Sequence, residues 1–148
     1  MKYETLPNVT LPKIGFGTWS LGGGTFPDPK LDSASLTALR SALEIGYTHF
    51  DTAEYYAAGH SEELVGRAVR ETNTPREKVF ITTKSSKRTR REAEAELHAS
   101  LKSLKTDYLD LWQMHGVQSQ DDIDRIFSPG GALEAFEAAK SAGKCRFF

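Results

Sequence analysis

The sequence contains one cysteine, Cys145, among 148 residues. A single cysteine excludes an intrachain disulfide and favours a reducing compartment. The first residues lack the apolar core of a signal peptide. No apolar run approaches the ~18 residues that a membrane helix needs. We therefore expect a cytoplasmic protein with no membrane partner.

The sequence also lacks a strong charge of either sign, because its formal net charge is −1. The basic cluster at residues 87–91 has no aromatic residue interleaved with it, so a nucleic-acid partner is not expected. No two of the four histidines have the i, i+4 spacing of a helical zinc site, so no metal is expected. Hydrophobic residues make up 39% of the chain, enough for the core of one domain over residues 1–148.

What the sequence does contain is an alternation of short strand patterns with longer helix patterns. Residues 3–11 predict a β-hairpin around Pro7-Asn8. Strands are then expected at 14–19, 48–51, 79–83, 108–112 and from 145 onward. Helices are expected from 32 or 33 to 46, from 61, from 89, and over 132–142. Two long loops, 20–31 and 116–130, separate these elements, the second with one helical turn at 121–127.

Three helix starts carry specific signals. Asp32 or Ser33 is expected to cap the first helix. Ser61, followed by two glutamates, is expected to open the second. Thr89 and Glu92 have the spacing of a capping box for the third.

The alternation predicts an α/β fold with parallel strands. The chain has four complete βα units after the hairpin, and the start of a fifth. A (β/α)8 TIM-type barrel needs about 250 residues, so this chain would hold about half of one. A small doubly wound sheet is the alternative, and periodicity does not choose between the two.

Polar residues follow the predicted strands at their C-terminal ends. They are Asp51 and Tyr56 after the second strand, Lys84 after the third and His115 after the fourth. In parallel α/β folds these strand ends meet on one side of the sheet, so we expect the four side chains to converge.

Together these four residues suit proton transfer. Free tyrosine, with a pKa of about 10, is a poor acid at neutral pH. The ammonium group of Lys84 would stabilise a phenolate, Asp51 would hold Lys84 in place, and His115 would donate a hydrogen bond to a substrate oxygen. Such a site protonates a carbonyl oxygen as hydride reaches the carbon. The hydride requires a nicotinamide cofactor.

Each residue alone also has a structural interpretation. Asp51 would serve as a helix cap, Tyr56 as a packed aromatic, and His115 as a core histidine. Lys84 would belong to the solvated basic cluster at 87–91. Only the conjunction on successive strand ends favours catalysis.

The motifs resemble those of the aldo-keto reductases over almost the whole chain. Residues 51–56 (DTAEYY) resemble the family's Asp-Thr-Ala-x-x-Tyr signature. Similar likenesses hold for its continuation at 59–68, the lysine strand at 79–84, the histidine strand at 108–115, the first strand at 15–19 and the N-terminal hairpin, which closes the bottom of the family's barrel.

The resemblance implies a role for each matching residue. The family tyrosine stands five residues after the aspartate, which selects Tyr56 over Tyr55. Tyr56 is then the general acid, Asp51 and Lys84 tune it, and His115 orients the carbonyl. The implied reaction is NADPH-dependent reduction of small aldehydes or ketones to alcohols. The implied cofactor-binding residues are Gly17, Thr18, Trp19 and Asp51.

Residues 143–148 resemble the family's entry into its fifth strand. In the family, the later half carries the residues that bind the carboxamide, stack on the nicotinamide and read the 2′-phosphate. A truncated half barrel has open strand edges, so a homodimer that completes the barrel is expected. The alternative function is a non-catalytic fragment or binding subunit that keeps the half-fold. The loops at 20–31 and 116–130 would contribute substrate walls with Trp19 and Trp112, although Trp112 fits a buried core position equally well.

Overall fold

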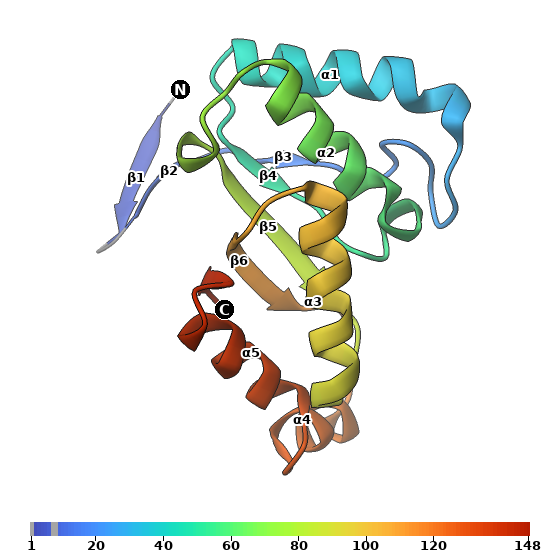
Figure 1. The fold of residues 1–148 in the computed structure, drawn as a ribbon, viewed down its shortest axis with the longest axis vertical. Coiled ribbons are helices and arrows are strands. Elements are labelled where there is room, and N and C mark those ends of the chain that lie inside the picture. The colour runs from blue at the N-terminus through green and yellow to red at the C-terminus, as the bar shows by residue number, and fades with distance from the viewer. Residues whose placement is uncertain (1, 7–8) are drawn as a thin grey trace.

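A computed structural model describes residues 2–6 and 9–148. An antiparallel hairpin, β1 (Tyr3–Leu6) and β2 (Val9–Pro12), precedes a five-stranded parallel sheet. That sheet contains β3 (Phe16–Gly17), β4 (His49–Asp51), β5 (Phe80–Ser85), β6 (Leu109–Met114) and β7 (Cys145–Phe147). The helices are α1 (Asp32–Glu44), α2 (His60–Glu71), α3 (Arg90–Leu104), α4 (Gln120–Phe127) and α5 (Ala132–Ser141), with short 3-10 turns η1 (Pro29–Leu31), η2 (Tyr56–Gly59) and η3 (Arg76–Lys78) (Figure 1).

The order of the strands decides between the two predicted folds. The sheet runs β3-β4-β5-β6-β7, in chain order and without a reversal. Because parallel crossovers are right-handed, a sheet that never reverses keeps its helices on one face. The helices pack in the same succession, α1 on α2, α2 on α3 and α3 on α5. This is the order of a barrel wall, and it excludes the doubly wound alternative, which needs a switch point.

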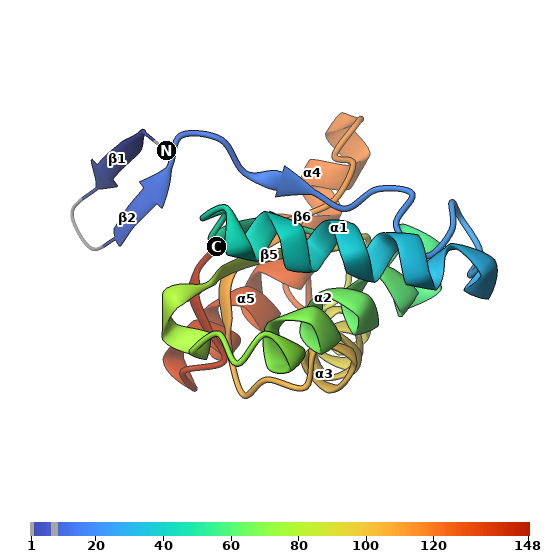
Figure 2. The same ribbon diagram turned by 90° about the horizontal axis from the view of Figure 1, so that it is seen from above.

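The predicted hairpin is present and stands beside the main body (Figure 2). Its turn at Pro7-Asn8 lies outside the described residues. A small cleft is lined by residues 9–11 of β2 together with Thr48, Val79 and Phe80, at the start of β4 and β5. The hairpin therefore lies at the N-terminal end of the sheet, as expected.

A buried carboxylate, that of Asp110, connects the elements at the N-terminal end of the sheet. The side chain of Asp110 is 1% exposed. It accepts hydrogen bonds from Arg76 at 2.8 Å, Arg146 at 2.7 Å and the backbone N–H of Ile81 at 3.0 Å. A buried charge is tolerated only when it is paired and hydrogen-bonded, and here the pairing ties η3, β5, β6 and β7 together.

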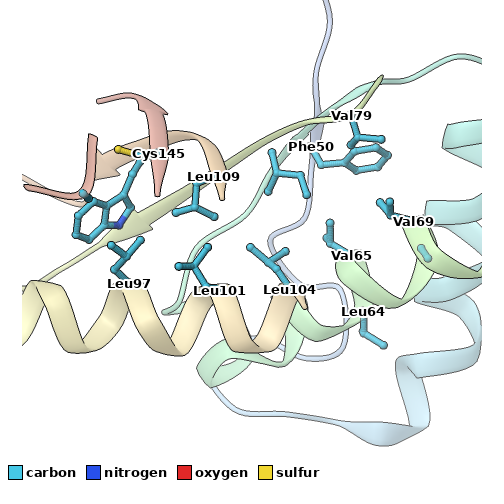
Figure 3. Close-up of a cluster of buried hydrophobic side chains, with 14 of the residues drawn as sticks. Phe50, Leu64, Val65, Val69, Val79, Leu97, Leu101, Leu104, Leu109 and Cys145 are labelled. Atoms are coloured by element: carbon cyan, nitrogen blue, oxygen red, sulfur yellow. The ribbon is translucent and has the colours of Figure 1, made fainter. Parts of the chain in front are cut away.

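The core lies between the sheet and the helices. Leu97, Leu101 and Leu104 of α3 line up along the helix and face the strands, and Val65 of α2 lies beside them (Figure 3). Trp112 on β6 is fully buried and stacks on Phe136 of α5, with 3.7 Å between ring centroids. This settles the open alternative for Trp112 in favour of the core. Within the described residues, no helix is long and apolar enough to cross a membrane.

Several predicted elements differ in length from the structure. The strands expected at 79–83 and 108–112 each extend two residues further, to 85 and 114, so Lys84 lies within β5 and not after it. The first strand, expected over 14–19, pairs only at Phe16–Gly17, because it is an edge strand with a single neighbour, β4. The single turn expected at 121–127 is instead the full helix α4. Ser119 caps it by accepting a hydrogen bond from the backbone N–H of Asp122 at 3.1 Å, and a serine directly before a helix is a recognisable start signal.

The predicted helix caps were wrong in detail. Neither Asp32 nor Ser33 caps α1, because the helix continues directly from η1 and Asp32 bonds to His60 instead. Helix α2 begins at His60, one residue before the expected Ser61. Thr89 is the N-cap residue of α3, but its hydroxyl bonds the Glu92 side chain at 2.5 Å and caps no backbone N–H.

Gly66 makes the contact between α2 and α3 possible. A Cβ at Gly66 would overlap the backbone carbonyl of Leu104. Alanine in a helix is otherwise up to about 1 kcal/mol more favourable than glycine.

We predict that Gly66→Ala lowers the free energy of unfolding by about 1–3 kcal/mol, the cost of overpacking, despite this gain. Urea denaturation measures it. Gly24→Ala, where a Cβ meets nothing within 4 Å, is the control. A more stable Gly66→Ala variant would disprove the close contact.

Candidate active site

The C-terminal ends of the central strands form a continuous rim. In the register of the sheet, Gly17 on β3 lies beside Asp51 on β4, and Asp51 lies beside Thr82 on β5. Lys84 lies two residues beyond Thr82 on β5, and His115 directly follows β6. The sheet thus brings together residues that are as much as 98 positions apart, from 17 to 115.

The ammonium group of Lys84 is the centre of this rim. It donates to Asp51 Oδ1 at 2.6 Å, to the backbone carbonyl of Thr52 at 2.8 Å and to the hydroxyl oxygen of Tyr56 at 3.2 Å. A lysine ammonium has three N–H donors and no acceptor, so these three oxygens use all of them. The Tyr56 oxygen accepts from Lys84, which leaves the phenolic O–H free to donate elsewhere.

A tight turn fixes the position of Tyr56. Its backbone N–H bonds to the carbonyl of Ala53 at 3.1 Å, and the next N–H, of Ala57, bonds to Gly24 in the loop after β3 at 2.7 Å. Ala57 and Ala58 both have positive φ, of 49° and 50°. The left-handed region costs an alanine roughly 1–2 kcal/mol, so this turn is held by its surroundings.

Aromatic rings surround Tyr56. The rings of Trp19 and His115 approach it edge-on, with centroids 5.0 Å and 5.8 Å away. Tyr55 is half exposed and stacks on Trp19 at 6.3 Å. The lysine bond goes to Tyr56 and not to Tyr55, which agrees with the choice made from the motif spacing.

His115, which directly follows β6, faces the phenol ring of Tyr56. Partial burial lowers its pKa from the usual 6.5, and the nearby Lys84 ammonium lowers it further. Its imidazole is therefore neutral at pH 7, with one N–H to donate. Its backbone N–H bonds to the carbonyl of Ser85 at 2.8 Å, which ties it to the end of β5.

Two buried glutamates behind the rim were not expected from the sequence. Glu62 on α2 is 1% exposed and accepts a hydrogen bond from Thr83 on β5 at 2.6 Å. Burial raises its pKa to about 7, against hydrogen bonds from Thr83 and Ser100 that lower it. Glu96 on α3 accepts a hydrogen bond from Ser85. Both bonds hold residues adjacent to Lys84. Acidic residues on helices normally predict a solvated face, so only the tertiary structure reveals these two.

The predicted cofactor-binding residues differ in whether their side chains are exposed or buried. A Cβ on Gly17 would meet nothing within 4 Å, so the space beside Asp51 is open. Trp19 is 50% exposed and packs against the rings of Tyr55 and Tyr56. Thr18 is fully buried, and its hydroxyl accepts a hydrogen bond from Ser61 at 2.9 Å. The side chain of Thr18 therefore shapes the loop from behind and does not reach the open space.

Asp51 is the partly exposed acidic residue beside Gly17. The Asp51 side chain is 37% exposed, and only its Oδ1 is bonded to Lys84, which leaves an oxygen available to a hydroxyl donor. Within the described residues, no group of three or more histidine, cysteine, aspartate or glutamate side chains is arranged to hold a metal ion.

The sequence profile of the Aldo/keto reductase family matches residues 13–148. The chain belongs to this family. It is 41% identical to an aldehyde reductase of Saccharomyces cerevisiae over 107 residues, which cover 72% of this chain and 30% of the yeast protein.

Solved structures of family members give the same result for the fold. A thermostable aldo-keto reductase crystallised with the inhibitor epalrestat superposes with a TM-score of 0.87 at 35% identity, covering 99% of this chain and 52% of that one. A Klebsiella pneumoniae aldo-keto reductase in complex with NADPH gives a TM-score of 0.79 at 29% identity, covering 99% and 49%. The predicted barrel-type fold is confirmed, and the chain spans about half the length of these proteins.

The buried carboxyl of Glu62 makes stability depend on pH. Its pKa of about 7 in the folded protein lies above its ordinary 4.5. The folded state therefore holds a proton that the unfolded state releases, and this contribution to stability is lost as pH rises from about 4.5 through 7. We predict that Glu62→Gln reduces the fall in thermal midpoint across this range.

Differential scanning fluorimetry at several pH values measures the midpoint. The exposed Glu137→Gln variant should follow the wild type. An unchanged pH dependence in Glu62→Gln would show that Glu62 is ionised in the fold.

Proposed function

We propose that this chain carries the proton-transfer half of an NADPH-dependent reductase that converts small aldehydes or ketones to alcohols. The observation that carries the proposal is the three-way bonding of the Lys84 ammonium to Asp51, Thr52 and the Tyr56 hydroxyl. The membership of the family supports it.

Tyr56 is the proton donor in this proposal. Its hydroxyl oxygen accepts from Lys84, so its own O–H points to a substrate carbonyl oxygen. As negative charge develops on that oxygen, the proton moves to it, and the Lys84 ammonium stabilises the phenolate that remains. Asp51 keeps the ammonium in place and balances its charge.

His115 orients the substrate. Its ring lies 5.8 Å from that of Tyr56, so a carbonyl oxygen between them can accept from both groups. The lowered pKa of His115 keeps the imidazole neutral, so it donates one N–H as a hydrogen bond but is not a competing acid, which leaves Tyr56 as the acid. The exposed pair of Trp19 and Tyr55 forms an apolar wall beside the same position.

Nicotinamide supplies hydride when bound, and NADPH is the form present in the related Klebsiella structure. We propose that Gly17, Trp19 and Asp51 border its ring and ribose, with Thr18 shaping the loop between them. We further propose that residues 1–148 act within one barrel domain, and that the protein is cytoplasmic.

Replacing Tyr56 tests the proton-transfer step. We predict that Tyr56→Phe lowers kcat for NADPH-dependent reduction of 4-nitrobenzaldehyde on the order of 100-fold to 10,000-fold, the contribution of a positioned acid. Tyr55→Phe, which loses a hydroxyl without a lysine bond, should stay within a few-fold of the wild type.

The same experiment separates the two candidate functions. Equal turnover by Tyr56→Phe and wild type would disprove Tyr56 as the acid. A folded wild-type chain that neither quenches NADPH fluorescence nor reduces the aldehyde would instead favour the non-catalytic fragment or binding subunit.

We also propose that the 148-residue chain forms a homodimer. β3 and β7 are the two edges of its parallel sheet. A two-fold axis along the strands would place β7 of each copy beside β3 of the other and close both edges at once. Sedimentation equilibrium should then give twice the mass of 16.4 kDa. A mass of one chain across the micromolar range would rule the dimer out.

A further inference from the structure

Arg88 lies between β5 and α3 and holds the segment that follows β6. Its guanidinium donates to the carbonyls of Ser86, His115 and Gly116, each at 3.0 Å. Its Nε donates to the carboxylate of Asp122 at 2.8 Å. The Arg88 side chain is only 11% exposed. One side chain therefore connects the end of β5, the residue after β6 and the first turn of α4.

These contacts fix the peptide of His115 from both sides. The N–H of His115 bonds to Ser85, and its carbonyl accepts from Arg88. Gly116, whose carbonyl also accepts from Arg88, has a φ of +62°, so the chain turns sharply away directly after His115. A residue at the start of such a turn has no regular strand pairing to orient it, and Arg88 supplies the missing constraint.

Asp122 fixes Arg88 in turn. Its carboxylate accepts from Arg88 and from the backbone N–H of Gln118 at 3.1 Å. The hydrogen bond from Arg88 is the main reason that the pKa of Asp122 falls to about 2. Asp122 is thus ionised at any pH where the protein works. It neutralises the guanidinium while leaving both terminal nitrogens directed at the carbonyls.

We infer that Arg88 is a positioning residue for the proposed carbonyl reduction, acting through His115. It contacts the backbone of His115 and not the side chains of the site, and its effect is to hold the imidazole opposite the Tyr56 hydroxyl. The inference rests on the proposed function of His115 as the group that orients the carbonyl.

The set of hydrogen bonds made by Arg88 requires an arginine side chain and not a lysine. A planar guanidinium presents five N–H donors in a fixed fork, whereas a lysine ammonium presents three from one point. Arg88 donates to four acceptors, which are three backbone carbonyls and the carboxylate of Asp122. This number fits the five donors of a guanidinium and exceeds the three donors of an ammonium.

A double-mutant cycle with His115 tests the inference. We expect Arg88→Met to lower kcat for aldehyde reduction about tenfold to 100-fold, because a displacement of about 1 Å costs up to that factor. In a His115→Ala background the same change should lower kcat by less than twofold, since the group that Arg88 positions is gone. The KM for NADPH should change little in either background.

Arg91→Met is the matched control, because Arg91 is a neighbouring arginine exposed on the first turn of α3. It should leave kcat unchanged. Equal fold losses from Arg88→Met with and without His115 would overturn the inference and show a general structural role. An unchanged kcat in Arg88→Met would overturn it as well.

A second readout does not depend on turnover. The Arg88 cation contributes to the lowered pKa of His115, so Arg88→Met should move the NMR titration of the His115 ring upward, toward 6.5, while Arg91→Met should not. An unmoved titration would contradict the contact. A wild-type protein without turnover would count against the proposed function, and this titration would still decide whether Arg88 sets the environment of His115.

Discussion

The candidate site depends on the burial of one positive charge. The Lys84 side chain is 14% exposed, and an ammonium removed from water must find oxygens for all its protons. It finds a carboxylate, a backbone carbonyl and a phenol, all contributed by residues 51–56. The carboxylate balances the charge, the carbonyl fixes the direction, and the phenol receives the remaining donor. Tyr56 is thus chemically distinct from Tyr55 because only one of them completes the lysine's bonding.

That arrangement in turn requires the register of the sheet. Asp51 and Lys84 meet because β4 and β5 pair in parallel with Asp51 beside Thr82. At the opposite end of the same strands, the buried Asp110 fixes η3, β5 and β7 through two arginines and a backbone N–H. The two charged clusters are separated along the strands, so one end of the sheet carries the candidate chemistry and the other carries stability, as is usual in barrel folds.

The fold type and the meeting of Asp51, Tyr56, Lys84 and His115 follow from local sequence patterns, while the catalytic roles of these four residues stay predictions. Strand ends are visible from periodicity, and a fixed five-residue spacing distinguishes Tyr56 from its neighbour. Other features depend on contacts between distant segments. Glu62 and Glu96 occupy helix positions that predict exposure, yet both are buried and accept hydrogen bonds from hydroxyl groups on β5. Arg88 looked like one member of a basic cluster, and only folding brings it to the carbonyl of His115. β3 lies at the edge of the parallel sheet and pairs with β4 alone over two residues, a position in the sheet that no local pattern encodes.

The residues proposed to transfer the proton, Tyr56, Lys84 and His115, are held by hydrogen bonds from nearby residues. Every bond of the Lys84 ammonium goes to residues 51–56, and Ser85 and Arg88 hold His115 from the end of the neighbouring strand. The strain of two left-handed alanines after Tyr56 is balanced within the same region, by a bond to the loop after β3. The contacts that hold the proposed proton-transfer residues therefore all come from strand ends and loops that lie next to one another in this fold.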